Sequence, residues 1–577
     1  MKFFCVLCVF CASVVNCLAL DREAFTFTKY ELGARVEPEQ QRLGVRGKIT
    51  LRNDSDSPQK NLSLQVSSTL HWLSIQFEGK PIPFDSQVYT SDIDHTGALS
   101  EAIVTLPRPV APRQVVELEI GYEGVIPQDA TRLTRIGVPA DTAKHSDWDQ
   151  IGTTFTAVRG IGYVAWYPVS VEAANLSEGS GVSEAVGRWK QREAQVELMK
   201  IMFKHSGTTG VPPILFCNGR GSVRGTEQMG RSYSAETECV FHSLSTTVPL
   251  FLLGNFDALD RPAVNISYRP EHKAGAEDYA LAIEETAPFV TEWFGDHKAE
   301  WVSKAEVIEL PDPQAAPFES ANMLLIPLPG KDSALLLSAI QQLTHLSFPS
   351  PRVWIYAGLA RYAQLRFLQE RGGRQTVLEY LKNHKDALLE SEKRIVAPGD
   401  NRAANHSLIN STDDFYVQAK ALDVWWMLRD IVGETALNAA LHNYKASDDK
   451  SAYYMQKLIE GQVHRDLEWF FDDWVYRDRG LPDFRIVSVY PRQLLNGGYL
   501  VTVTVENLGE AGAEVPVTLH MQNTESSERL VVPGKSQASI RIQTGTLPQE
   551  ATVNDGSVPE SDTSNNVYRL KSGPDEK

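Results

Sequence analysis

Residues 341–364 read QQLTHLSFPSPRVWIYAGLARYAQ and lie near the middle of the chain. Around this stretch, apolar residues recur at the three- and four-residue spacing of amphipathic helices. The segments that follow this spacing are 279–294, 334–346, 353–368 and 419–432. We therefore predict a mainly helical domain with its own apolar core over residues 256–484.

The sequence on both sides of this helical region alternates with the period of two that β-strands show. On the N-terminal side, the stretch 116–122 places an apolar side chain at every second position. This pattern predicts an antiparallel β-saddle or β-sandwich over residues 20–255. On the C-terminal side, the stretch 501–505 alternates in the same way. There we predict a small immunoglobulin-like β-sandwich over residues 485–577, which ends in a polar tail from Gly556.

Length and charge exclude some classes of function. The chain has 577 residues, with 56 Lys and Arg against 73 Asp and Glu, a net charge of −17. Such an acidic protein repels phosphate backbones and anionic lipid headgroups, so we expect no nucleic-acid partner and no polybasic membrane attachment. At about 150 residues per domain the length suggests three or four domains. The boundaries above give three.

The first nineteen residues have the features of a signal peptide. Lys2 gives a positive start, residues 3–15 are apolar apart from Ser13, and residues 17–19 (CLA) approximate a cleavage motif. We expect cleavage after Ala19 and export to the periplasm or the extracellular space. An uncleaved membrane helix needs about 20 apolar residues, more than this run offers. Lipidation of a signal cysteine is the other alternative.

The cysteines fall into two groups. Four of the six lie in the signal segment, at positions 5, 8, 11 and 17. The other two, Cys217 and Cys239, would meet in an oxidising compartment after export, so we expect a disulfide between them. Zinc binding by this pair is the lesser alternative, because cysteine-based metal sites usually use closely spaced pairs.

The stretch 341–364 resembles the zinc-site segment of gluzincin metallopeptidases of the aminopeptidase N type. In that family H-E-x-x-H is followed on the next helix by W-x-x-E-G. Both His and the second Glu hold zinc, and the first Glu activates water. The resemblance extends over about residues 25–485 through weaker pieces in the family's order: AWYP at 165–168, WFG at 293–295, FES at 318–320 and GLP at 480–482. It implies that the helical domain is thermolysin-like.

The zinc motif is degenerate in this chain. The family's first His falls on Gln341 and its general-base Glu on Gln342. The second His falls on His345 and the ligand Glu on Ala357, after a shorter spacer than is typical. Only one of the four positions is kept. We expect His345 to be an ordinary helix histidine that is satisfied by hydrogen bonds.

These replacements predict the loss of both metal binding and chemistry. Amide oxygens are weak zinc ligands, and no carboxylate remains to offset the charge of the dication. The amide of Gln342 has no useful basicity and cannot take a proton from water. We therefore expect no resident cofactor, although zinc would be required if the chain is active through a ligand set that the motif does not show.

Further site residues are implied by the same resemblance. If FES at 318–320 occupies the region of the family's G-A-M-E-N motif, Glu319 matches the Glu that grips a substrate's free amine. The alternative is an exposed carboxylate on an edge strand. The family's oxyanion-stabilising Tyr falls on Gln418, with Tyr416 two residues earlier, so stabilisation of a transition state is also in doubt. Glu319 and Tyr416 are the candidate substrate-binding residues.

The sequence thus favours an exported aminopeptidase N-like pseudoenzyme that binds peptides or proteins without cutting them. One alternative is an active zinc metalloaminopeptidase with a non-standard ligand set. Another is an envelope scaffold or adhesion protein that uses its C-terminal sandwich as a binding module.

Overall fold

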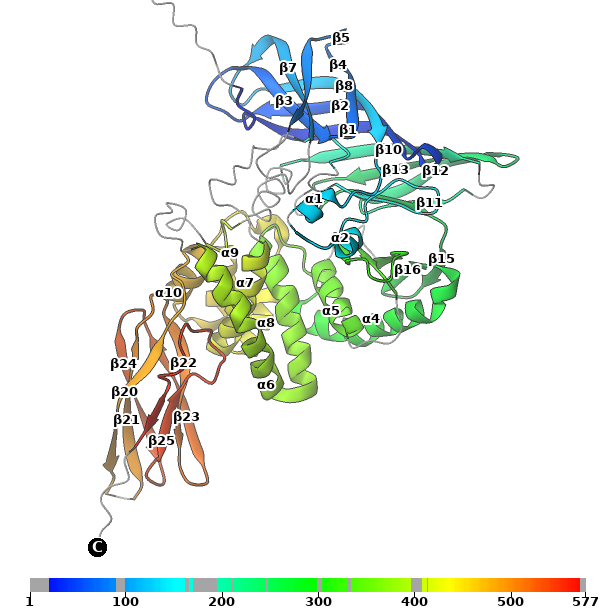
Figure 1. The fold of residues 1–577 in the computed structure, drawn as a ribbon. Helices are drawn as coiled ribbons and strands as arrows, with labels where there is room; N and C mark the ends of the chain where they lie inside the picture. The colour runs from blue at the N-terminus through cyan, green and yellow to red at the C-terminus, as the bar shows by residue number, and fades with distance from the viewer. Residues whose placement is uncertain are drawn as a thin grey trace, which may run out of the picture.

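A computed structural model describes most of the chain. The described residues are 20–89, 99–135, 137–160, 165–169, 195–208, 212–244, 247–297, 304–328, 334–395, 407–411, 414–495 and 497–570. The predicted signal peptide, 1–19, lies outside them. Strands near the N-terminus, helices in the centre and strands near the C-terminus follow one another through the molecule (Figure 1). No helix within the described ranges is long and apolar enough to span a membrane.

An eight-stranded sheet dominates the N-terminal region. Its strand order is β12-β13-β10-β1-β2-β8-β4-β5, in which β1 pairs antiparallel with β2 and parallel with β10. The strands are β1 (Phe25–Glu37), β2 (Arg42–Asn53), β4 (Leu70–Phe77), β5 (Lys80–Pro81), β8 (Val115–Val125), β10 (Leu198–Gly207), β12 (Arg220–Met229) and β13 (Ser232–Phe241). The 3₁₀ turn η1 (Pro38–Gln40) joins β1 to β2.

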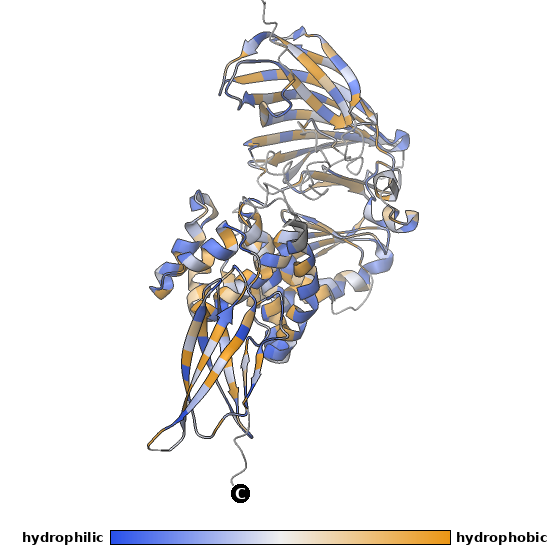
Figure 2. Ribbon diagram, turned by 60° about the vertical axis from the view of Figure 1, so that its left-hand side comes forward, coloured by the Kyte–Doolittle hydropathy of each residue, from blue (hydrophilic) through white to orange (hydrophobic). Residues whose placement is uncertain are grey.

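A smaller sheet contributes to the same core. It has the order β3-β7-β6, with β3 (Gln59–Ser67), β7 (Leu99–Val110) and β6 (Phe84–Tyr89). Leu62 and Leu64 from this sheet and Leu118 from β8 are fully buried in one apolar cluster. The alternation of hydrophobic and hydrophilic residues along the strands is visible in Figure 2. The period-two pattern therefore predicted this region correctly.

A three-stranded sheet follows towards the centre of the molecule, with the order β11-β14-β9. Its strands are β11 (Ile214–Cys217), β14 (Leu250–Gly254) and β9 (Thr156–Arg159), and the short helices α1 (Thr131–Arg135) and α2 (Ala140–Ser146) precede β9. The predicted disulfide is confirmed: Cys217 at the end of β11 is bonded to Cys239 in β13.

The central region begins with a five-stranded sheet. Its order is β15-β16-β17-β19-β18, with β16, β17 and β19 parallel and β18 antiparallel at one edge. The strands are β15 (Asp257–Asp260), β16 (Val264–Tyr268), β17 (Ala305–Glu309), β18 (Phe318–Ser320) and β19 (Met323–Ile326). Side chains of β18 alternate between the two faces of the sheet, and Glu319 points to the face on which α5 lies.

The predicted helices are confirmed and run beyond their predicted limits. They are α4 (Lys273–Phe294), preceded by the turn η5 (Pro270–His272), α5 (Ala334–Ser347), α6 (Val353–Ile395), α7 (Asp414–Val432), α8 (Glu434–His442), η7 (Ala446–Asp448), α9 (Tyr454–Val463), α10 (Glu468–Phe471) and the π-helical η8 (Asp472–Tyr476). The helix α6 kinks at Gly373, whose φ is 75°. Trp354, Trp425 and Trp474 are fully buried among these helices.

Two sheets form the C-terminal region, in the orders β20-β21-β24 and β23-β22-β25-β26. The strands are β20 (Phe484–Gln493), β21 (Tyr499–Asn507), β22 (Ala513–His520), β23 (Glu525–Val532), β24 (Gln537–Thr544), β25 (Glu550–Val553) and β26 (Val567–Arg569). The apolar core of the helices continues into these sheets. At the junction, the indole of Trp474 donates a 2.7 Å hydrogen bond to the carbonyl of Gly512.

The prediction of a polar tail from Gly556 was wrong. Val558 and Glu560 are almost completely buried, and β26 adds a strand after them. The polar side chains point inward because they bond to one another: Asn554 and Asn566 both donate to Oε1 of Glu560. Only residues 571–577 lie outside the described part of this end.

Candidate functional site

Glu319, Gln341 and His345 come together where β18 meets α5. Gln341 and His345 lie one helical turn apart, so both side chains leave the same face of α5. The amide Nε2 of Gln341 donates a 3.1 Å hydrogen bond to Oε2 of Glu319. On the other side, Nδ1 of His345 lies 2.9 Å from Oε1 of Glu319. We call these three residues the Glu319 site.

His345 is not the satisfied helix histidine that we expected. Its side chain and that of Glu319 are each only 9% exposed. Neither ring nitrogen has a hydrogen-bond partner within the described residues, and Oε1 of Glu319 has none either. The 2.9 Å contact is therefore close enough for an ion pair but is not aligned as a hydrogen bond. The imidazole stacks on the ring of Tyr356, with centroids 3.9 Å apart and planes 8° apart.

Gln342, at the family's general-base position, belongs to the core and not to the Glu319 site. It is 1% exposed. The hydroxyl of Tyr279 in α4 donates to its Oε1 at 2.9 Å, and its Nε2 donates to the carbonyl of Glu306 in β17 at 3.1 Å. Both ends of the amide are thus used to join α4, α5 and the sheet. Burial raises the pKa of Tyr279 well above its usual value, and the charge of Glu319 adds to this effect.

The helices α5 and α6 run antiparallel beside the site. His345 stacks on Tyr356 at one end, and Nε2 of Gln364 donates a 2.9 Å hydrogen bond to the carbonyl of Leu337 at the other. Ala357, which replaces the family's ligand Glu, lies on α6 next to Tyr356 and keeps partial exposure. Its methyl group can neither bind a metal nor accept a proton.

Arg361 stands one helical turn beyond Ala357. Residues at i, i+4 and i+7 share a helix face, so Ala357, Arg361 and Gln364 point to the same side of α6. The guanidinium donates to Oε1 of Gln364 and to Oε1 of Gln418, each at 3.2 Å. Gln418, at the family's oxyanion-Tyr position, is therefore a partner of Arg361.

Tyr416 lies in a different, buried cluster. Its hydroxyl donates to Asp478, which also accepts from Lys420. Lys420 is fully buried and reaches Glu392 at 2.8 Å as well. Burial lowers the pKa of Lys420, but the two carboxylates more than offset it, so the pKa is raised overall. The side chain of Tyr416 is thus committed to a buried ion cluster.

The residues present do not fit a catalytic zinc site. Such a site uses three protein ligands and leaves a fourth position for water. The Glu319 site offers only His345 and Glu319, whose unbonded atoms face each other, together with the weak amide of Gln341. The described residues contain no group of three or more His, Cys, Asp or Glu side chains placed to hold a metal ion.

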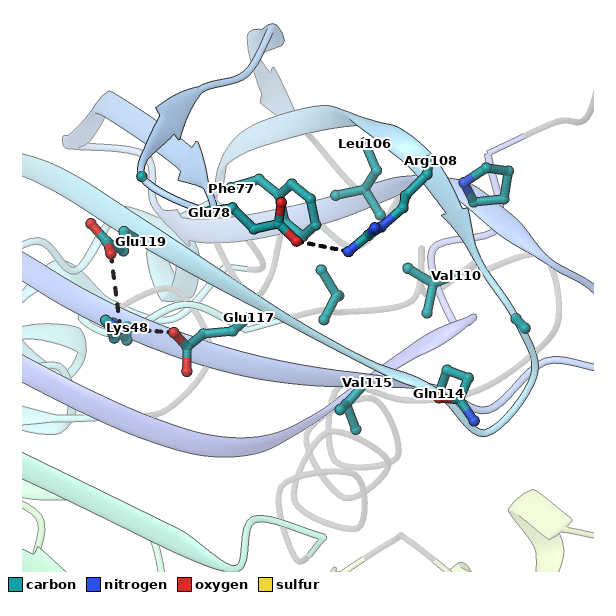
Figure 3. Close-up of a pocket in the computed structure, with 14 residues that line it drawn as sticks. Lys48, Phe77, Glu78, Leu106, Arg108, Val110, Gln114, Val115, Glu117 and Glu119 are labelled. Carbon is teal, nitrogen blue, oxygen red and sulfur yellow. Dashed lines mark hydrogen bonds and ion pairs between the residues drawn. The ribbon is translucent and has the colours of Figure 1, made fainter.

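A separate hollow of about 650 Å³ lies in the N-terminal β region (Figure 3). Phe77, Leu106 and Val115 are among the residues that line it. Arg108 forms an ion pair with Glu78 at 2.7 Å. Lys48 forms ion pairs with Glu117 at 2.8 Å and with Glu119 at 3.9 Å. The lining contains no histidine, serine, threonine or cysteine, and the carboxylates of Glu78, Glu117 and Glu119 are paired with Arg108 and Lys48, so we do not consider this hollow a candidate catalytic site.

Comparison with known proteins shows the fold. No family model and no curated protein matches the chain. Among solved structures, an M1 zinc metallopeptidase from Deinococcus radiodurans matches with a TM-score of 0.51 and 15% identity, over 81% of this chain and 97% of that one. Aminopeptidase A from Legionella pneumophila, solved in complex with aspartic acid, matches with a TM-score of 0.61 and 11% identity, over 94% of this chain and 59% of that one.

These structures bear out the resemblance on which the fold prediction rested. The N-terminal β region and the helical centre are arranged as in M1 zinc metallopeptidases. At identities of 11% and 15% the likeness concerns the fold and not the activity. The chain therefore has the aminopeptidase N-like gluzincin fold.

Proposed function

We propose that this protein is an exported, aminopeptidase-like pseudoenzyme that has lost zinc-dependent peptidase activity and binds peptides or proteins through their free amine. The observation that carries the proposal is the position of the Glu319 carboxylate, which lies between Gln341 and His345. These are the two helix positions from which the family's His ligands hold zinc. The site therefore contains one imidazole, one carboxylate and one weak amide, which is one strong ligand fewer than a catalytic zinc site uses.

The loss of catalysis follows from the contacts of Gln342. A general base must reach the water that attacks the substrate and must accept its proton. The amide of Gln342 does neither, because it is buried and bonded to Tyr279 and to the backbone of Glu306. With Tyr416 bound to Asp478, the nearby Tyr that could replace the missing oxyanion donor is committed elsewhere.

The proposed binding of an amine follows from the unsatisfied atoms. A buried carboxylate oxygen and two buried ring nitrogens without hydrogen bonds are costly, at roughly 1–3 kcal/mol for each unsatisfied group. A ligand ammonium group has three N–H donors. It would satisfy Oε1 of Glu319 and could donate to a neutral His345 as well. The bound peptide thus completes bonds that the protein alone leaves unmade.

Export and an immunoglobulin-like C-terminal sandwich complete the proposal. The signal-like residues 1–19 and the Cys217–Cys239 disulfide support a periplasmic or extracellular location. The two packed C-terminal sheets support an immunoglobulin-like sandwich.

Two assays test the proposed function. The first measures release of naphthylamine from alanyl-naphthylamide, with and without a chelator. We expect no turnover above background. Chelator-sensitive turnover that is lost in His345→Ala but kept in His71→Ala, a matched change at an exposed histidine of β4, would establish the alternative of an active zinc enzyme.

The second assay measures peptide binding by calorimetry, using trialanine with a free or an acetylated amine. We expect the free amine to bind at least tenfold more tightly and Glu319→Gln to remove this difference. Equal affinity for both peptides in the unaltered protein would overturn the proposed amine site.

A further inference from the structure

Arg361 has an environment unlike that of other arginines near it. Its guanidinium bonds only to the neutral amides of Gln364 and Gln418, and no carboxylate partner exists for it within the described residues. The neighbouring arginines all pair with acids: Arg352 with Asp449, Arg366 with Glu434, Arg371 with Glu285, Arg374 with Asp430, and Arg429 with Asp430. In a chain of net charge −17, a half-buried cation held only by amides is the exception.

The two amides give this cation a fixed position. Gln364 is itself held by the carbonyl of Leu337, so the chain of contacts runs from α5 through Gln364 to Arg361. Gln418 holds the other side of the guanidinium from α7. Arg361 is therefore oriented by groups that do not neutralise it. A planar guanidinium with free N–H groups matches the two oxygens of a carboxylate.

Helix geometry relates Arg361 to the Glu319 site. Tyr356 on α6 lies opposite His345, on which it stacks. Arg361 follows Tyr356 by five residues along the same helix. At 1.5 Å per residue this step is about 7.5 Å along the helix. An extended chain covers about 3.3–3.6 Å per residue, so two residues span about 7 Å. Along the axis of α6, Arg361 thus lies beyond the level of His345 by about the length of a dipeptide. Glu319 also bonds to Gln341, which lies on the Arg361 side of His345, so a short peptide is long enough to join Glu319 to Arg361.

We propose that Arg361 binds a carboxylate of the ligand, so that the site selects short peptides, and dipeptides above all, by both of their charged ends. The inference rests on the proposed function, because Glu319 supplies the amine end. It adds that the ligand must be short and must have a free C-terminus. A long protein segment with no terminus near Arg361 would bind less well.

Calorimetry with four blocked forms of one dipeptide tests this selection. The probes are L-alanyl-L-alanine, its C-terminal amide, its N-acetyl form and the doubly blocked form. In the unaltered protein we expect the C-terminal amide to bind at least tenfold more weakly than the free dipeptide. In Arg361→Gln both should bind equally weakly, while the preference for a free amine over an acetylated one persists. Arg371→Gln, at an exposed arginine on the same helix, should behave like the unaltered protein.

The outcomes separate the two proposals. If the amide binds as tightly as the free dipeptide while acetylation still weakens binding, the inference about Arg361 is wrong and the amine site stands. If acetylation has no effect, the proposed function fails, whatever Arg361 does. The comparison of the free and amidated dipeptide needs no variant, so misfolding of Arg361→Gln cannot obscure it. Arg361→Lys, which keeps the charge but loses the planar fork, should retain part of the preference.

Discussion

Oε1 of Glu319 lies 2.9 Å from Nδ1 of His345, yet neither atom makes a hydrogen bond within the described residues. The carboxylate comes from an edge strand and the imidazole from α5, so the fold itself brings them together. In a metallopeptidase the helix histidine would face a cation. Here it faces an anion, and this relationship separates the site from the chemistry that its fold usually carries.

Gln342→Glu, which restores the family's general base alone, is expected to destabilise the protein by about 1–3 kcal/mol. The new carboxylate would lack the N–H group that now donates to the carbonyl of Glu306. A carboxylate oxygen and this carbonyl oxygen, both acceptors, would then lie next to each other without a hydrogen bond. Urea unfolding measures the change. Gln228→Glu, at an exposed position of β12, is the control and should change stability by less than about 0.5 kcal/mol. An unchanged midpoint for Gln342→Glu would show that the amide is not anchored in the core.

Asp423 gives a predicted dependence of stability on pH. Burial raises its pKa to about 7, although Lys420 lowers it. Between the ordinary pKa near 4 and about 7, the folded protein binds more protons than the unfolded chain, so stability falls as pH rises through this range. We expect Asp423→Asn to remove this loss, which is on the order of 2–4 kcal/mol.

Unfolding at two pH values checks the prediction for Asp423. At pH 8 Asp423→Asn should be more stable than the unaltered protein. Near pH 4, where the aspartate is protonated in the folded state, the two should be nearly equal. A constant difference at both pH values would mean that the substitution acts through packing and not through titration.

Glu101 is predicted to give the opposite dependence of stability on pH from that of Asp423. Burial raises its pKa, but hydrogen bonds from Arg22, Ser63, Gln87 and Gln65 outweigh this and lower it to about 2. The folded pKa is thus below the unfolded one, and the stabilisation is present above pH 4.5 and is lost as pH falls towards 2. Glu101→Gln should cost about 3 kcal/mol at pH 7 and much less near pH 2. An equal cost at both pH values in guanidinium unfolding would contradict this.

Lys420 is expected to be essential for stability. Lys420→Met removes the cation between Glu392 and Asp478 and leaves both carboxylates buried without it. Breaking a buried pair in this way costs about 3–5 kcal/mol. Thermal unfolding measures the loss, with the exposed Lys445→Met as control. Similar melting temperatures for the two variants would show that the cluster contributes little.

Much of the fold could be predicted from the sequence because its signals are local. Periodic apolar residues set the strands of the β regions and the helices α4 to α7, and the cysteine count isolated Cys217 and Cys239. The order of weak motifs then placed Glu319 near the degenerate helix. The strands, the helices and the disulfide need only spacing and composition along the chain. The place of Glu319 was implied by the resemblance to aminopeptidase N-type gluzincins.

The rest of the site depends on contacts that spacing does not give. The motif identified the position of Gln342, but it could not show the hydrogen bonds that hold Gln342 in the core. The site roles of Tyr356 and Arg361 were missed, although Arg361 stands four residues after Ala357 and so shares its helix face. The buried end of the C-terminal region was missed because Glu560 and its asparagine partners are polar in composition. Their burial depends on contacts made only in the folded chain, where Asn554, Asn566 and the backbone N–H of Phe484 donate to Glu560.

Zinc stoichiometry tests the central claim most directly. The purified full chain would be equilibrated with zinc, dialysed and analysed for metal by mass spectrometry. With only His345 and Glu319 available as strong ligands at the site, we predict far less than one zinc per chain and no difference between the unaltered protein and His345→Ala. One zinc per chain that is retained on dialysis and lost in His345→Ala would contradict the account.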